Sequence, residues 1–229
     1  MKIKLLIICF LIANNSFSQK LGVFYNSDFY QYKFNDVVLN GYPTEHHYKN
    51  KQNYSIGMSF ELNKNLDYLG KLSYSKKGYK LKYKFSTLTP DPVPLPDFCK
   101  IQANYIDVSI GIGKPVIKHN DINLIPHIFF TTSFLFYSCS KMTNTAGEES
   151  ILNGDGYCLT PQNLEKFLYN TSIDLKFEYT LNKHISIFIQ PAMSYYLIKI
   201  EKDVIKQNPW AWHIGGGITL KLKKKENES

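Results

Sequence analysis

The feature of this sequence that most constrains its fold is a strict alternation of apolar and polar residues, clearest at residues 172–181, SIDLKFEYTL. Successive side chains of an extended strand point to opposite faces. One face of this segment is apolar and the other carries three charges: the first has Ile173, Leu175, Phe177, Tyr179 and Leu181, the second Asp174, Lys176 and Glu178. A soluble sheet would bury the apolar face, whereas a barrel in a lipid bilayer would bury the charged one.

The same alternation recurs along the chain and predicts eight strands. We expect them at residues 20–31, 52–63, 66–79, 101–115, 122–137, 168–181, 184–198 and 211–222. Most of these segments are long enough to cross a bilayer, because a tilted strand needs only about 9–11 residues to do so.

The connections between these strands alternate between short and long. Three are tight turns, at 63–65, 118–121 and 182–183, and four are long, at 32–51, 85–100, 138–167 and 199–210. Successive connections of an up-and-down barrel lie at opposite ends, so all four long loops would lie at one end. The pattern predicts an all-β fold, an eight-stranded antiparallel up-and-down transmembrane β-barrel. Eight strands leave room only for side chains inside, so no open pore is expected.

Residues 1–18 have the pattern of a secretory signal peptide. Lys2 and Lys4 precede an apolar run that is too short to span a membrane as a helix, and small residues flank the expected cleavage site. We expect residues 19–229 to form one outer-membrane barrel domain. Its long loops would be extracellular and both mature termini periplasmic.

Charged residues on the inward strand faces are the candidate site. A Lys facing lipid near the bilayer midplane costs about 2–4 kcal/mol, and a buried charge inside the barrel needs a partner. Lys176 stands between two acids at one-face intervals, so inside the lumen the acids can pair with Lys176 or with Lys71 across the barrel. The expected lumen charge network comprises Glu61, Lys71, Asp107, Asp174, Lys176 and Glu178.

Three cysteines follow the signal segment, and all are expected at or beyond the loop ends of strands. Disulfides form in the oxidising compartment outside the cytoplasm. Cys139 and Cys158 bound one segment of the longest loop, and a bridge between them would stabilise the fold by roughly 3 kcal/mol. Cys99 would then be free, or it would exchange with one of them.

Motifs that carry enzyme chemistry are missing from the sequence, which has no GxSxG, HExxH, P-loop or CxxC pattern. His46 and His47 are interpreted as solvated loop residues rather than metal ligands. The chain has no Arg, which weakens any nucleic-acid function. We therefore expect no catalytic, cofactor or metal site and no nucleic-acid partner. The expected partners are outer-membrane lipid and, through the long loops, another envelope or secretion protein.

Two stretches, YLGKLSYSKKGYKLKY at 68–83 and NYIDVSIGIGKPV at 104–116, carry a family resemblance. They resemble the Bacteroidetes outer-membrane β-barrel family often called PorT-like. Tyr74-Ser75-Lys76-Lys77-Gly78 matches that family's Tyr-Ser-x-Lys-Gly motif, and SFSQ at 16–19 resembles the signal ends of that phylum. The resemblance implies an eight-stranded outer-membrane barrel. It implies no activity, although the named family member assists protein secretion.

Several functions fit such a barrel. A structural or interaction role, in anchoring, adhesion or assistance to secretion, fits best. The alternatives are a ligand-binding or transport barrel, including a secreted lipocalin-like barrel with its apolar face inward, and a lipid-modifying barrel enzyme. A β-sandwich is the alternative fold.

Overall fold

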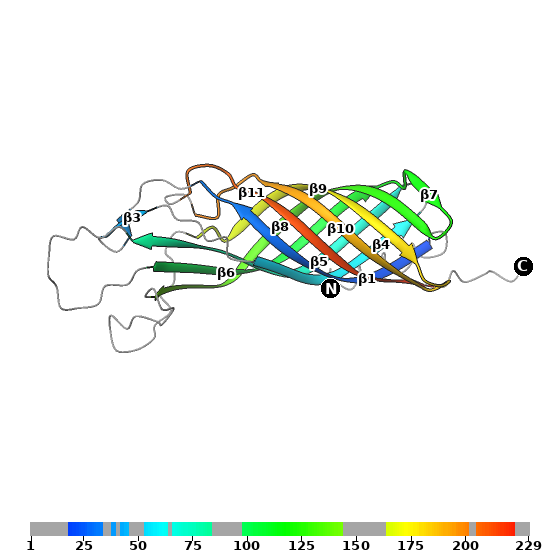
Figure 1. The fold of residues 1–229 in the computed structure, drawn as a ribbon, viewed down its shortest axis with the longest axis horizontal. Coiled ribbons are helices and arrows are strands. Elements are labelled where there is room, and N and C mark those ends of the chain that lie inside the picture. The colour runs from blue at the N-terminus through cyan, green and yellow to red at the C-terminus, as the bar shows by residue number, and fades with distance from the viewer. Residues whose placement is uncertain are drawn as a thin grey trace, which may run out of the picture.

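The computed structural model describes residues 18–33, 38–39, 42–45, 53–63, 66–83, 98–143, 164–201 and 205–222. Within these ranges, eight long antiparallel strands form a closed barrel (Figure 1). They are β1 (Ser18–Gln31), β4 (Asn53–Asn63), β5 (Asp67–Tyr83), β6 (Phe98–Gly113), β8 (Ile122–Thr143), β9 (Phe167–Thr180), β10 (Ile185–Tyr196) and β11 (Trp210–Leu222). The eight-stranded barrel expected from the alternation is confirmed.

Closure of the barrel rests on β1, which pairs with strands on both of its sides. Its residues 19–31 lie opposite β11, and its residues 18–28 lie opposite β4. Each other long strand pairs with its neighbours in the chain, so the order is up and down throughout. Gln19 lies opposite Leu222, so the described chain begins and ends at the same end of the barrel.

The two tight turns that the structure describes, at 118–121 and 182–183, lie at that same end and depend on Asn residues. Asn182 Oδ1 accepts hydrogen bonds from the backbone N–H groups of His184 and Ile185, at 2.8 and 2.9 Å. Asn120 adopts a left-handed conformation (φ 49°), which Asn tolerates better than most residues. It closes a hairpin between β8 and a short strand absent from the sequence prediction, β7 (Ile117–His119).

Three strands are longer than expected at the opposite end. β5 continues to Tyr83, β6 begins at Phe98 and β8 continues to Thr143, so parts of the connections expected at 85–100 and 138–167 are strand. We call residues 77–83, 98–104 and 137–143 of these strands the rim extension (Figure 1). The first long connection adds β2 (Val38–Leu39) and β3 (Tyr42–Glu45), and β3 pairs with the end of β5.

The outward face of the barrel is a continuous apolar surface. Ile110, Ile189 and Ile173 are 66%, 60% and 59% exposed, although they lie in the middle of long strands. The same holds for Val23, Ile56, Met58, Leu72, Val108, Ile128, Phe130, Phe177, Ile187, Ile214 and Ile218. The apolar face therefore points outward, and the lipocalin-like alternative with that face inward is wrong. No helix in the described part of the chain is long and apolar enough to cross a membrane.

Ser18, assigned above to the signal segment, is the first residue of β1. The other expected signal residues lie outside the described part of the chain, as do His46, His47 and Cys158.

Candidate functional site

The lumen of the described barrel is lined by polar and charged side chains, and three groups of paired charges lie along it. The first, the basal cluster, lies near the tight turns and consists of Lys20, Glu61, Lys176 and Glu178. The Lys20 Nζ donates to both carboxylate oxygens of Glu178, each at 2.9 Å, and lies 3.8 Å from Glu61. Lys176 donates to Glu61 and lies 3.9 Å from Glu178. Two lysines thus share two carboxylates.

The second group, the central cluster, is built around Asp174. Lys71 Nζ lies 3.1 Å from Asp174 Oδ2, and His127 Nδ1 lies 3.1 Å from Oδ1. Gln190 also donates to Asp174. The Lys71 ammonium lies 3.8 Å from the centre of the Phe129 ring, a cation–π contact that also fills lumen space.

The third group, the upper cluster, joins Lys77 to Asp107. Lys77 Nζ donates to Asp107 Oδ1 at 2.8 Å, and to the hydroxyls of Ser75 and Ser133 at 2.7 and 3.1 Å. The Lys77 ammonium also lies 4.6 Å from the centre of the Tyr105 ring. All three donor positions of this buried ammonium have partners, as a charge in a low-dielectric site requires.

The structure thus places all six residues of the expected network inside the barrel. Lys176 meets Glu61 and Glu178, as the one-face spacing suggested for Glu178, whereas Asp174 pairs with Lys71, the alternative partner across the barrel. Sequence reasoning missed Lys20, Lys77 and His127. Lys20 and Lys77 stand at the alternate strand positions that face the lumen, and this parity is the signal that would have identified them.

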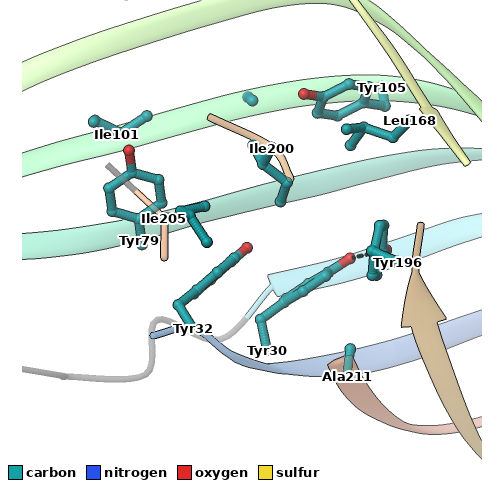
Figure 2. Close-up of a cluster of buried hydrophobic side chains, with 11 residues drawn as sticks. Tyr30, Tyr32, Tyr79, Ile101, Tyr105, Leu168, Tyr196, Ile200, Ile205 and Ala211 are labelled. Carbon is teal, nitrogen blue, oxygen red and sulfur yellow. Dashed lines mark hydrogen bonds between the residues drawn. The ribbon is translucent and has the colours of Figure 1, made fainter. Parts of the chain in front are cut away.

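A mouth cluster closes the lumen at the end that carries the long connections (Figure 2). Its buried members are Tyr30, Tyr32, Tyr79, Ile101, Ala103, Tyr105, Leu168, Tyr196, Ile200, Ile205 and Ala211. Tyr30 and Tyr196 join their hydroxyls at 2.9 Å. Burial raises the pKa of the Tyr32 phenol well above its ordinary value, so this side chain stays neutral.

The β10–β11 connection supplies the plug of this cluster. Ile200 and Ile205 come from it and are 1% and 0% exposed. Its backbone is tied to both sides of the mouth, because the Glu165 N–H donates to the Ile200 carbonyl at 2.9 Å and the Lys206 N–H donates to the Lys33 carbonyl at 2.6 Å. A loop expected to extend outward therefore folds inward over the lumen.

One cavity of about 80 Å³ remains between the mouth cluster and the charged groups. Its lining includes Asp28, Asn170, Ser194 and His213. A cavity of this size holds a few water molecules, since one water needs about 10–15 Å³ by the same measure.

Cys99 and Cys139 lie in the rim extension. Cys139 is buried and engaged in a disulfide. Its partner lies outside the described side chains, so the predicted bridge to Cys158 stays a prediction.

A closed eight-stranded barrel with paired charges inside and apolar side chains outside defines a transmembrane β-barrel. Solved structures with the same fold include Neisserial surface protein A, at 10% identity and a TM-score of 0.45 over 89% of this chain and 97% of that one. OprG of Pseudomonas aeruginosa matches at 11% identity and 0.44, over 90% and 97%. Ail of Yersinia pestis matches at 12% and 0.40, over 89% and 98%. Similarity at this level transfers no function. No family model and no curated protein matches the chain.

Proposed function

We propose that this chain is an outer-membrane barrel that serves as a closed anchor and presents a protein-binding rim outside the cell. The observation that supports it best is that apolar side chains face outward and charged side chains face inward, the reverse of the arrangement in a soluble protein. Ile110 is 66% exposed on the outer face, while Lys176 and Glu178 are 2% and 1% exposed inside. In water this arrangement would expose a whole apolar belt, whereas in a bilayer it satisfies both faces.

The rim extension supports an interaction role. β8 has 22 residues, about twice the number needed to cross the membrane. The mouth cluster and the paired charges argue against transport, because their buried side chains occupy the inside of the described barrel. We infer that the long connections are extracellular and both mature termini periplasmic, after removal of a signal peptide. Adhesion and assistance to a secretion machine, as in the PorT-like family of Bacteroidetes, are the roles that suit such a rim.

Gel mobility tests the membrane part of the proposal. The folded chain should fractionate with the outer membrane, and it should migrate faster unheated than boiled, because a closed strand network resists detergent. Recovery in the soluble periplasmic fraction would overturn the proposal.

A photo-crosslinking amino acid in place of Phe136, which is 56% exposed beside the rim extension, tests the interaction role. Crosslinks to an envelope protein of the bacterium that makes the chain would support a secretion helper. Crosslinks only to surface molecules of another cell to which that bacterium attaches would support an adhesin. No crosslink at this site in either setting would count against a protein-binding rim.

A further inference from the structure

Three polar residues on neighbouring strands form a chain of hydrogen bonds beneath the mouth cluster. His213 Nδ1 lies 2.7 Å from Asp28 Oδ1, and His213 Nε2 lies 2.6 Å from Ser194 Oγ. Asp28 and His213 are register partners on β1 and β11, and Ser194 lies on the adjacent strand β10. An ionised carboxylate only accepts hydrogen bonds, so Nδ1 carries the imidazole proton. Nε2 therefore accepts from the Ser194 hydroxyl.

We propose that Ser194 is an activated nucleophile that cleaves small acyl esters, with His213 as its general base and Asp28 as the positioning residue. A Ser–His–Asp chain of this kind is recognised by geometry and roles rather than by sequence position. The three residues come from three different strands, which is why no local sequence motif marks them. The proposal goes beyond the anchoring and binding role and does not depend on it.

The surroundings of Ser194 leave space for a reacting group. All three residues line the cavity of about 80 Å³. Asn170 lines the same cavity and carries an amide N–H, the kind of donor that stabilises a developing oxyanion. The cavity volume limits the acyl group to a short one, such as acetyl.

Tyr30 separates this cavity from a larger one of about 610 Å³ at the mouth, which Lys33 and Trp210 also line. Tyr30 lines both cavities, and its hydroxyl bonds to that of Tyr196 at 2.9 Å (Figure 2). Its ring meets that of His213 edge to face, with centroids 6.4 Å apart. A small ester bound at the mouth would reach Ser194 when the Tyr30 side chain moves aside.

The reaction balances with water as the second substrate. Ser194 Oγ bonds to the carbonyl carbon while its proton passes to His213 Nε2. The ester C–O bond breaks, and the leaving alcohol takes that proton. Water then attacks the acyl-serine and gives its proton to Nε2, which returns it to Ser194 Oγ as the carboxylic acid leaves.

Labelling of the refolded full chain with methanesulfonyl fluoride, whose methyl group matches the small cavity, mapped by mass spectrometry, tests the proposal. Ser172 is the matched internal control, because it is the register partner of Ser194 and lines the same cavity. General-base catalysis contributes roughly 100-fold or more. We expect Ser194 to react at least about 100-fold faster than Ser172, and His213→Gln to lose that advantage.

A variant of the positioning residue separates activation from structure. Asp28→Asn should lower the labelling rate of Ser194 toward that of Ser172, because His213 Nδ1 then loses the carboxylate that holds its proton, and Asp28→Glu should restore part of the rate. Lys71, Asp107 and Asp174 line the same cavity and stay unchanged in this comparison. Hydrolysis of 4-nitrophenyl acetate should vanish in Ser194→Ala and persist in Ser172→Ala.

Access is measured independently of activation. In a His213→Gln background, which removes the base, Ser194→Cys and Ser172→Cys should react at similar rates with a small methanethiosulfonate reagent, and Tyr30→Ala should speed both. The proposal is overturned if Ser194 stays unlabelled by the sulfonyl fluoride in both the natural chain and Tyr30→Ala. It is equally overturned if Ser194 reacts at the same rate with and without the His213 imidazole.

Discussion

Asp174 on β9 pairs with Lys71, which reaches it from β5 on another side of the lumen at 3.1 Å, and not with Lys176 two positions along its own strand. The lumen network therefore connects strands that are far apart in the sheet order β5-β6-β8-β9. Such a cross-lumen pair resists deformation of the barrel wall in a way that a pair within one strand would not.

Removal of Lys71 should destabilise the barrel. Lys71→Met would leave the buried Asp174 carboxylate without its ammonium, at a cost of about 3–5 kcal/mol in the free energy of unfolding. Asp174→Asn added to Lys71→Met should recover part of this loss, because no uncompensated charge remains. Urea unfolding in detergent measures the free energy of unfolding of the single and the double variant. Lys118→Met, on the exposed strand β7, is the control and should change little. Strictly additive single-variant effects would contradict a coupled pair.

Glycines of the barrel wall should tolerate substitution according to the space around them. A Cβ at Gly217, which faces the lumen, would overlap the Val23 carbonyl oxygen and lie 2.8 Å from Cζ of Phe188, whereas a Cβ at Gly70, which faces outward, would meet nothing within 4 Å. Gly217→Ala should therefore lower the unfolding midpoint or block refolding, and Gly70→Ala should not. Heat-modifiable gel mobility checks both variants. If both variants show the same gel mobility and unfolding midpoint, the Phe188 side chain moves aside without a loss of stability.

The plug and the charged lumen should seal the barrel independently. Ile205→Ala removes a fully buried side chain and should cost about 2–5 kcal/mol in unfolding free energy. It should not create steady conductance in planar bilayers, because the central and upper clusters still fill the lumen below it. A stable channel in Ile205→Ala would show that the plug alone closes the barrel.

The disulfide of Cys139 should join it to Cys158. Cys99 lies opposite Met142 in the β6–β8 ladder, three positions from the Gln102–Cys139 pair. Three strand residues span about 10 Å, beyond the roughly 7 Å between Cα atoms that a disulfide spans. Peptide mapping without reductant should recover a peptide that links Cys139 to Cys158. A linked peptide that contains Cys99 and Cys139 would refute this pairing.

Period-two alternation predicted the strands and the inward face because parity alone decides which side a strand residue takes. Parity does not decide which inward residues meet, since that depends on the stagger of strands around the closed barrel. This is why Lys176 was placed correctly in the lumen, while the partner of Asp174, Lys176 on its own strand or Lys71 across the barrel, stayed open. The same limit hid the contact of Asp28 with His213, which needs the closing β1–β11 register. The inward fold of Ile200 and Ile205 has no periodic signal at all.

Tryptophan quenching by brominated lipids tests most directly the claim that the apolar outer face contacts a bilayer. The chain has two Trp, Trp210 and Trp212, both about half exposed on the outer face near the mouth. In refolded vesicles, bromine near the headgroup should quench them more than bromine near the chain ends. Ile189→Trp, with both natural Trp replaced by Phe, should show the reverse depth order, because residue 189 lies near the middle of β10. If bromine at no depth quenches any of the three, the outer face does not contact lipid and the account is wrong.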